Sequence, residues 1–243
     1  MRSFTTLLEV QNLMLSRAGR VVLDIDALRL EPARILLLTG ANGAGKTSLM
    51  KVLAGLSVAD SGVFHGLGMS MSCREAARFC RGRHVYLHQT PYMFDSSVAQ
   101  NVAYGLRVRG QTLATRHAEV QAALAWAGLE ALATRPARAL SLGEQQRVAL
   151  TRAYVLAPNA LLLDEITANL DAEHRRQVHD MLGALRERGT SVVFATHDPA
   201  PLLARVDHHL HLEAGRLTPP TRGTGQVVPL RRDSARPDSP HHS

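Results

Sequence analysis

The chain has few cysteines, no long apolar run and a stretch near its start without aromatic residues. The first two shortages argue against a disulfide-held fold and against a membrane-spanning chain. Only two of its 243 residues are cysteines, Cys73 and Cys80, so disulfides do not hold the fold, and we interpret both as free thiols rather than as a metal or redox pair. No apolar run approaches the ~18 to 20 residues that span a bilayer, and the opening segment MRSFTTLLEV lacks the apolar core of a signal peptide. We therefore expect a soluble, cytoplasmic chain that reaches a membrane only through a partner.

The charge is strongly positive, with 28 basic residues, a net charge of +7 and a pI of about 10.2. The basic residues are scattered along the chain, and attraction to phosphates or to an anionic membrane surface accounts for them as well as nucleic acid does. Apolar residues make up 45% of the chain, which is enough for a substantial core in one large domain or in a core with a small subdomain.

Short apolar runs alternate with helical patterns along the chain, which predicts an α/β fold. Several of the runs are apolar on both faces, as in a covered and mostly parallel sheet; they are LLEV, VVLDI, RILLLTG, HVYLH, ALLLD and SVVFA. From about residue 90 to 157 the pattern is helical, so we expect a helical subdomain inserted into the core. The proline-rich segment 218–243 has no periodicity and is expected to be a disordered tail.

A phosphate-loop motif, GANGAGKT, lies between the predicted strand ILLLT and the helical pattern SLMKVLAGL. Its glycines let backbone N–H groups close around a β-phosphate, Lys46 reaches the β and γ oxygens, and Thr47 offers a hydroxyl to Mg²⁺. The residues expected to bind the nucleotide here are Gly40, Ala41, Asn42, Gly43, Ala44, Gly45, Lys46, Thr47 and Ser48.

Polar residues follow three further predicted strands, where ligand sites of α/β sheets form. Asp164 and Glu165 end ALLLDE; Asp164 can hold Mg²⁺ through water, and Glu165 can polarise the water that attacks a γ-phosphate. His197 follows SVVFA and Gln89 follows HVYL. A histidine in such a turn is often only a cap or a surface residue, but the shared sheet edge favours a γ-phosphate contact for both. After His197, Asp198-Pro predicts the start of a helix.

The stretch SLGEQQR starts a helix in a way that favours anion binding. Ser141 and Glu144 have the spacing of a capping box, and a helix start offers free N–H groups and a positive dipole end. Because the chain already has a phosphate loop, a second anion site suggests a nucleotide held by another subunit.

Taken in order, GANGAGKT, Gln89, SLGEQQR, LLLDE, ANLD and His197 resemble the motif series of the ATP-binding cassette (ABC) ATPases, over roughly residues 7–217. The resemblance implies a single domain, residues 1–217, with a RecA-like P-loop NTPase core, an antiparallel β subdomain and the inserted helices. It implies ATP and Mg²⁺ as ligands, with Glu165 as the catalytic base and Asp164 supporting the metal together with Thr47 and Gln89.

The same resemblance implies that Gln89 and His197 sense the γ-phosphate. Ser141, Gly143 and Glu144 would face ATP held by an opposing subunit, and Asp171 would lie near the dimer seam. Two cassettes would then sandwich two ATP molecules, and one cassette per chain implies a homodimer.

The sequence departs from the family's usual pattern in three ways. The family's signature motif, which SLGEQQR matches here, usually has two glycines, and Leu142 replaces the first of them. Ile166 replaces the proline that usually follows the catalytic glutamate. No aromatic residue lies between Phe4 and Phe64 to stack on adenine. A planar guanidinium can stack instead, so Arg17 or Arg20 is the candidate. This predicts poor discrimination between ATP and GTP.

Within the family the chain resembles importer ATPases, and most of all those of tungstate-type oxyanion importers. The resemblance implies permease subunits in the membrane, an indirectly linked substrate-binding protein, a peripheral position on the cytoplasmic face of the cell membrane, and no nucleic-acid partner. Tyr92, Met93 and Phe94 are either exposed contacts for the permease or core residues of the helical subdomain. The alternatives are an exporter or lipoprotein-release ATPase and, with less support, a soluble ABC protein acting on nucleic acid.

Overall fold

The computed structural model describes residues 6–200 and 202–218. The strands are β1 Leu8–Arg17, β2 Arg20–Leu30, β3 Ile35–Thr39, β4 Ser61–Gly66, β5 Met69–Met71, β6 His84–Leu87, β7 Ala160–Asp164, β8 Ser191–Ala195, β9 His208–Glu213 and β10 Arg216–Thr218. The α-helices are α1 Lys46–Leu53, α2 Cys73–Arg81, α3 Val98–Val108, α4 Leu113–Ala127, α5 Leu142–Tyr154 and α6 Ala172–Glu187, with 3₁₀ turns at Glu130–Leu132, Ala137–Ala139 and Leu203–Arg205.

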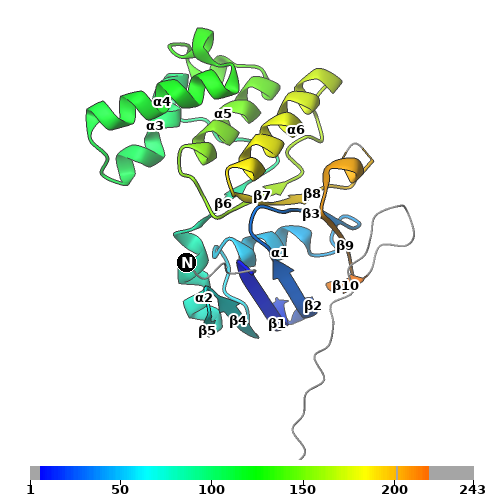
Figure 1. Ribbon diagram of the computed structural model, residues 1–243. Coiled ribbons are helices and arrows are strands. Elements are labelled where there is room, and N and C mark those ends of the chain that lie inside the picture. The colour runs from blue at the N-terminus through cyan, green and yellow to red at the C-terminus, as the bar shows by residue number, and fades with distance from the viewer. Residues whose placement is uncertain (1–5, 201, 219–243) are drawn as a thin grey trace, which may run out of the picture.

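A six-stranded sheet in the order β10-β9-β3-β8-β7-β6 forms the centre of the molecule (Figure 1). All of its pairs are parallel except β10 with β9. Successive residues of each central strand join different cores: Leu36 and Leu38 pack with α1, whereas Ile35 and Leu37 pack with α5 and α6. A strand with both faces covered is apolar throughout, which is why β3, β7 and β8 were recognisable as unbroken apolar runs.

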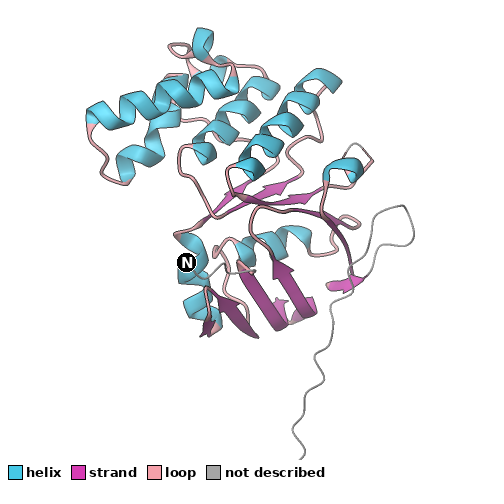
Figure 2. Cartoon of the chain, in the orientation of Figure 1, coloured by secondary structure: helices cyan, strands magenta, loops and turns pink. Residues whose placement is uncertain are grey.

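A second sheet, antiparallel and in the order β2-β1-β4-β5, lies on the other side of α1 (Figure 2). Helix α1 contacts both sheets, and its apolar residues Leu49, Met50 and Leu53 are buried between them. The phosphate-loop motif therefore opens onto a helix that is fixed on two sides. The predicted α/β class and the antiparallel subdomain are confirmed.

Helices α3, α4 and α5 occupy the segment 90–157, all of which the structure describes, and no named strand interrupts it. They gather above the six-stranded sheet in Figure 1, next to α6. None of the helices in the described part of the chain is long and apolar enough to cross a membrane. The predicted tail falls almost wholly outside the described residues, since β10 ends at Thr218.

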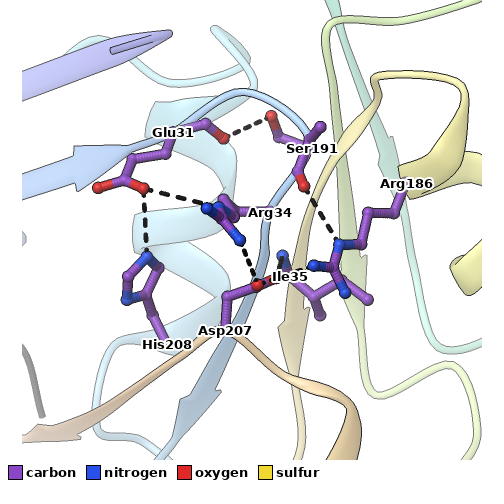
Figure 3. A network of polar contacts seen from close by, with 8 residues as sticks. Glu31, Arg34, Ile35, Arg186, Ser191, Asp207 and His208 are labelled. Atoms are coloured by element: carbon purple, nitrogen blue, oxygen red, sulfur yellow. Dashed lines mark hydrogen bonds and ion pairs between the residues drawn. The ribbon is translucent and has the colours of Figure 1, made fainter. Parts of the chain in front are cut away.

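A polar network ties the start of strand β9 to its neighbour β3 and to α6 (Figure 3). The Asp207 carboxylate, whose side chain is 12% exposed, accepts hydrogen bonds from the Arg34 guanidinium at 2.8 Å, the Arg186 guanidinium at 2.9 Å and the Ile35 backbone N–H at 2.8 Å. His208 contacts Glu31 at 3.4 Å in the same network. One carboxylate thus holds the starts of β3 and β9 and the end of α6.

We expect Asp207→Asn to lower the free energy of unfolding by about 2 kcal/mol, because two guanidinium groups lose their charged acceptor. Urea unfolding followed by circular dichroism measures the change. Asp95→Asn is the control: its pair with Arg138 is exposed at the surface and is expected to contribute less than about 0.5 kcal/mol. Equal effects of the two substitutions would contradict the prediction.

Candidate functional site

A pocket of about 760 Å³ opens at the carboxyl ends of β3, β6, β7 and β8. The parallel strands deliver the segments that follow them to one sheet edge, as α/β ligand sites require. The lining residues are Val22, Asn42, Gly43, Gly45, Lys46, Thr47, Ser48, His88, Gln89, Asp164, Glu165, Ala168, Asn169 and His197. Residues predicted from four separate motifs therefore share one pocket.

The phosphate loop wraps around the Lys46 ammonium group. Its Nζ donates to the carbonyl oxygens of Gly40 at 2.7 Å and Ala41 at 3.1 Å, and the side chain is only 6% exposed. Gly43 and Gly45 have φ values of 82° and 107°, a left-handed conformation that favours glycine. The loop is thus curved around a buried cation, a shape that suits a polyphosphate.

The last two strands hold this loop in place. The Gly215 N–H donates to the Ala44 carbonyl at 3.1 Å, and the Gly215 carbonyl accepts from the Asp24 N–H at 2.9 Å. A Cβ on Gly40 would overlap the Leu212 carbonyl oxygen of β9, so only glycine fits there. Strand β9 and the turn into β10 therefore belong to the support of the nucleotide site.

Asp164 ends β7 with its side chain directed at the start of α1. Its Oδ2 accepts from the Thr47 hydroxyl at 2.7 Å and from the Tyr86 hydroxyl at 2.9 Å. Burial and the neighbouring Asp164 carboxylate raise the pKa of Tyr86, so Tyr86 remains a donor. Carboxylate and hydroxyl oxygens are the ligands that Mg²⁺ prefers, and their adjacency fits such an ion.

The carboxylate of Glu165 lies between the side chains of Lys46 and His197. Its Oε1 is 3.6 Å from Lys46 Nζ, and its Oε2 is 3.3 Å from His197 Nδ1. Its φ of 53° is left-handed, which is uncommon outside glycine and clusters at functional sites. This sharp turn lets the chain leave β7 while the carboxylate stays in the pocket.

Gln89 is anchored through its backbone. The Gln146 side chain of α5 donates to the Gln89 carbonyl at 2.6 Å, which leaves the Gln89 side chain to line the pocket. Because Gln146 is almost fully buried, the contact joins the helical segment firmly to the sheet edge.

The prediction that a helix starts at Asp198 is wrong. The Thr196 hydroxyl accepts from the Asp198 N–H at 3.0 Å, forming a tight side-chain turn that competes with a helical start. The only helical turn described after it is the 3₁₀ turn Leu203–Arg205. His197 accordingly sits on a short turn and not at a helix cap.

The start of α5 has the predicted capping box. The Ser141 hydroxyl accepts from the Glu144 N–H at 3.3 Å, and the Ser141 N–H donates to the Glu144 carboxylate at 2.8 Å, which lowers the pKa of Glu144. Neither these residues nor Gly143 and Asp171 line the pocket. We call Ser141 to Glu144, at the start of α5, the signature turn. Within one chain the structure does not bring the signature turn to the phosphate loop.

The three departures from the family pattern have distinct surroundings. Leu142 is 38% exposed at the first turn of α5, whereas Ile166 is buried in the core. Arg17 donates to the Ser57 hydroxyl at 3.0 Å, and neither Arg17 nor Arg20 lines the pocket, although Val22 does. Stacking of either arginine on a base stays a prediction.

The aromatic segment after Gln89 is split between surface and core. Tyr92 is 67% exposed, Met93 is buried, and Phe94 is half-buried against Tyr104 with ring centroids 4.3 Å apart. Of the two alternatives, Met93 takes the second, because its side chain joins the core of the helical segment.

The contacts of three residues in or near these motifs were not predicted. The residues are Tyr86, Gln146 and His174, each of which contacts a motif residue through its side chain. Tyr86 carried a weak signal as the one hydroxyl within an apolar strand. Gln146 belongs to SLGEQQR, but neither it nor His174 carried a signal of its contact, since that contact depends on how separate elements pack.

Comparison with known proteins gives several matches. The family model described as ABC transporter matches residues 23–168. The chain is 33% identical to the tungstate uptake system ATP-binding protein TupC of Peptoclostridium acidaminophilum, over 86% of this chain and 95% of that protein. It is 37% identical to a probable anion import ATP-binding protein of Haloferax volcanii, over 74% and 67% of the two chains.

Two further matches extend the comparison. The chain is 34% identical to the sulfate/thiosulfate import ATP-binding protein CysA of Bradyrhizobium diazoefficiens, over 86% of this chain and 62% of that longer protein. Among solved structures, cbiO1 from Clostridium perfringens, described as part of the ABC transporter complex cbiONQ, superposes with a TM-score of 0.81 at 26% identity, covering 88% of each chain.

Proposed function

The chain belongs to the ABC transporter family, and from this membership we propose that it hydrolyses ATP to drive import through separate permease subunits. The observation that carries the proposal is the meeting of Lys46, Glu165 and His197 in one pocket, with Glu165 3.6 Å from the lysine and 3.3 Å from the histidine. A cation for phosphate, a base for water and a donor for the γ-phosphate are the parts that phosphoryl transfer to water requires.

The predicted residues of the pocket have separate roles in this proposal. Lys46 exchanges its loop carbonyls for the β and γ oxygens of ATP, and the curved loop Gly40 to Ser48 donates its N–H groups to the phosphates. Glu165 accepts the proton of the attacking water. His197 and Gln89 contact the γ-phosphate and the water from the other strand ends.

Thr47, Asp164 and Gln89 are the residues that would hold Mg²⁺. The hydroxyl of Thr47 and the carboxylate of Asp164 are already 2.7 Å apart, and Tyr86 steadies the carboxylate through a second hydrogen bond. Bound there, the ion neutralises charge on the phosphate oxygens.

A second copy of the chain completes the site in this proposal. Ser141, Gly143 and Glu144 lie outside the pocket of their own chain, at a helix start whose free N–H groups suit an anion. In a homodimer they face the ATP held by the phosphate loop of the other copy, and Asp171 lies near the seam. An isolated monomer is then nearly inactive.

The matched relatives support import, and the tungstate and anion proteins among them support an oxyanion as cargo. The cassette would work on the cytoplasmic face of the cell membrane, beside a permease that receives its cargo from a substrate-binding protein. The cargo never contacts the cassette, so uptake assays with tungstate, molybdate and sulfate test the substrate.

Tyr92 is the proposed contact for the permease, because it is two-thirds exposed and lies just after Gln89. We expect Tyr92→Ala to reduce permease-stimulated ATP hydrolysis at least tenfold, since losing an aromatic anchor at an interface costs about 2 kcal/mol. Affinity for ATP stays within twofold. The assay compares hydrolysis with and without permease in lipid vesicles.

Val21→Ala is the matched control, because Val21 is 58% exposed on the antiparallel sheet, away from the helical segment. It should leave stimulation unchanged. Full stimulation of the Tyr92→Ala protein would contradict this contact, and failure of any permease to stimulate the wild type would contradict the transport proposal.

A further inference from the structure

His174, which no motif of the sequence includes, lies directly against the signature turn. Helices α5 and α6 run side by side (Figure 1), and His174 in the first turn of α6 faces Gly143 in the first turn of α5. A Cβ on Gly143 would overlap Cδ2 of the imidazole and would lie 2.9 Å from its Nε2. The ring therefore occupies the space that any other residue at position 143 would need.

Asp171 holds this ring in place. The Nδ1 of His174 is 2.8 Å from both carboxylate oxygens of Asp171, and the His174 N–H donates to the same carboxylate at 2.9 Å. These hydrogen bonds keep the pKa of Asp171 below its usual range. His174 thus contacts both Asp171, which is proposed to lie near the dimer seam, and Gly143, which is proposed to face the nucleotide of the other copy.

The contact between His174 and Gly143 joins two helices that are far apart in the sequence. Helix α5 belongs to the helical segment, whereas α6 follows β7 and its carboxylates Asp164 and Glu165. The imidazole is 29% exposed and lies between the first turns of α5 and α6.

We propose that His174 is a positioning residue that fixes the signature turn relative to Asp171 and thereby sets how tightly that turn engages nucleotide held by a second cassette. The proposal rests on the cassette dimer described above. It predicts that loss of the ring weakens closure of the dimer and leaves binding of ATP to the phosphate loop of the same chain unchanged.

The test uses the full chain in the Glu165→Gln background, with ATP-dependent dimerisation measured by light scattering and ATP affinity by a fluorescent analogue at low protein concentration. We expect His174→Ala to weaken dimerisation at least tenfold while ATP affinity changes less than twofold. His174→Phe retains a ring over Gly143 but loses the hydrogen bonds of Nδ1 to Asp171, so its loss should lie between that of the parent and that of His174→Ala. Arg176→Ala, an exposed neighbour on α6, is the control and should have no effect.

The outcomes separate the two proposals. Dimerisation of the His174→Ala protein at the parent level overturns the role of His174, and so does an equal loss in the Phe and Ala variants. Absence of any ATP-dependent dimer in the parent, even with permease present, overturns the cassette dimer itself and this inference with it.

A second measurement tests the contact without any dimer. Gly143→Ala should lower the melting temperature of the chain, because the new methyl group overlaps the imidazole, and adding His174→Ala should recover most of that loss. Equal melting temperatures for Gly143→Ala and the double variant would show that the ring does not press on Gly143, and would overturn the proposal.

Discussion

Glu165→Gln is expected to reduce ATP hydrolysis by about 10²- to 10⁴-fold, the range that general base catalysis contributes. The amide has the size of the carboxylate but cannot accept the proton of the attacking water. It also removes the charge that Lys46 Nζ meets at 3.6 Å and His197 at 3.3 Å. Release of phosphate under saturating ATP measures the loss.

Binding should survive this substitution, because the groups that hold the phosphates are intact. The variant is therefore expected to accumulate as an ATP-bound dimer, with its permease present if the isolated cassettes associate weakly. Glu173→Gln is a matched control at an exposed position of α6 and should hydrolyse ATP normally. Near-normal turnover in Glu165→Gln would remove Glu165 from the role of base.

Lys46→Ala is expected to have the opposite profile, with ATP affinity lowered about 100-fold or more. A buried ammonium that hydrogen-bonds phosphate contributes about 1.5 to 3 kcal/mol per bond, and Lys46 also ties the loop through the Gly40 and Ala41 carbonyls. Titration with a fluorescent ATP analogue measures the affinity directly.

The only other lysine of the chain supplies the control for that experiment. Lys51 lies on the same helix but is exposed, so Lys51→Ala should bind ATP as the wild type does. Binding by Lys46→Ala within threefold of the wild type would show that the loop backbone suffices. Together, the Glu165 and Lys46 variants separate chemistry from binding.

Local pattern predicted much of the fold. The strands β3, β7 and β8 were recognisable because both of their faces are buried, so that each is an unbroken apolar run. The capping box at Ser141 was equally local, since its two partners are three residues apart. Polar residues that directly follow such strands were predictable as pocket residues for the same reason.

Contacts between distant elements were beyond the reach of the sequence. Nothing in the segment around His174 indicates that its ring covers Gly143, because that depends on how α5 and α6 pack. The exposure of Tyr92 beside the buried Met93 depends likewise on the path of one loop. The helix predicted to start at Asp198 is not formed, because the Asp198 N–H donates to the Thr196 hydroxyl in a tight turn.

The hydrogen bond from Gly215 to the phosphate loop has a consequence for protein synthesis. A chain emerges from the ribosome N-terminal end first, so the loop at residues 40–47 is made before the strands that hold it. The nucleotide site can reach its final shape only after residue 215 has left the ribosome. A premature stop after His197 and before β10 would therefore yield a chain that carries every recognisable motif and still lacks a formed site.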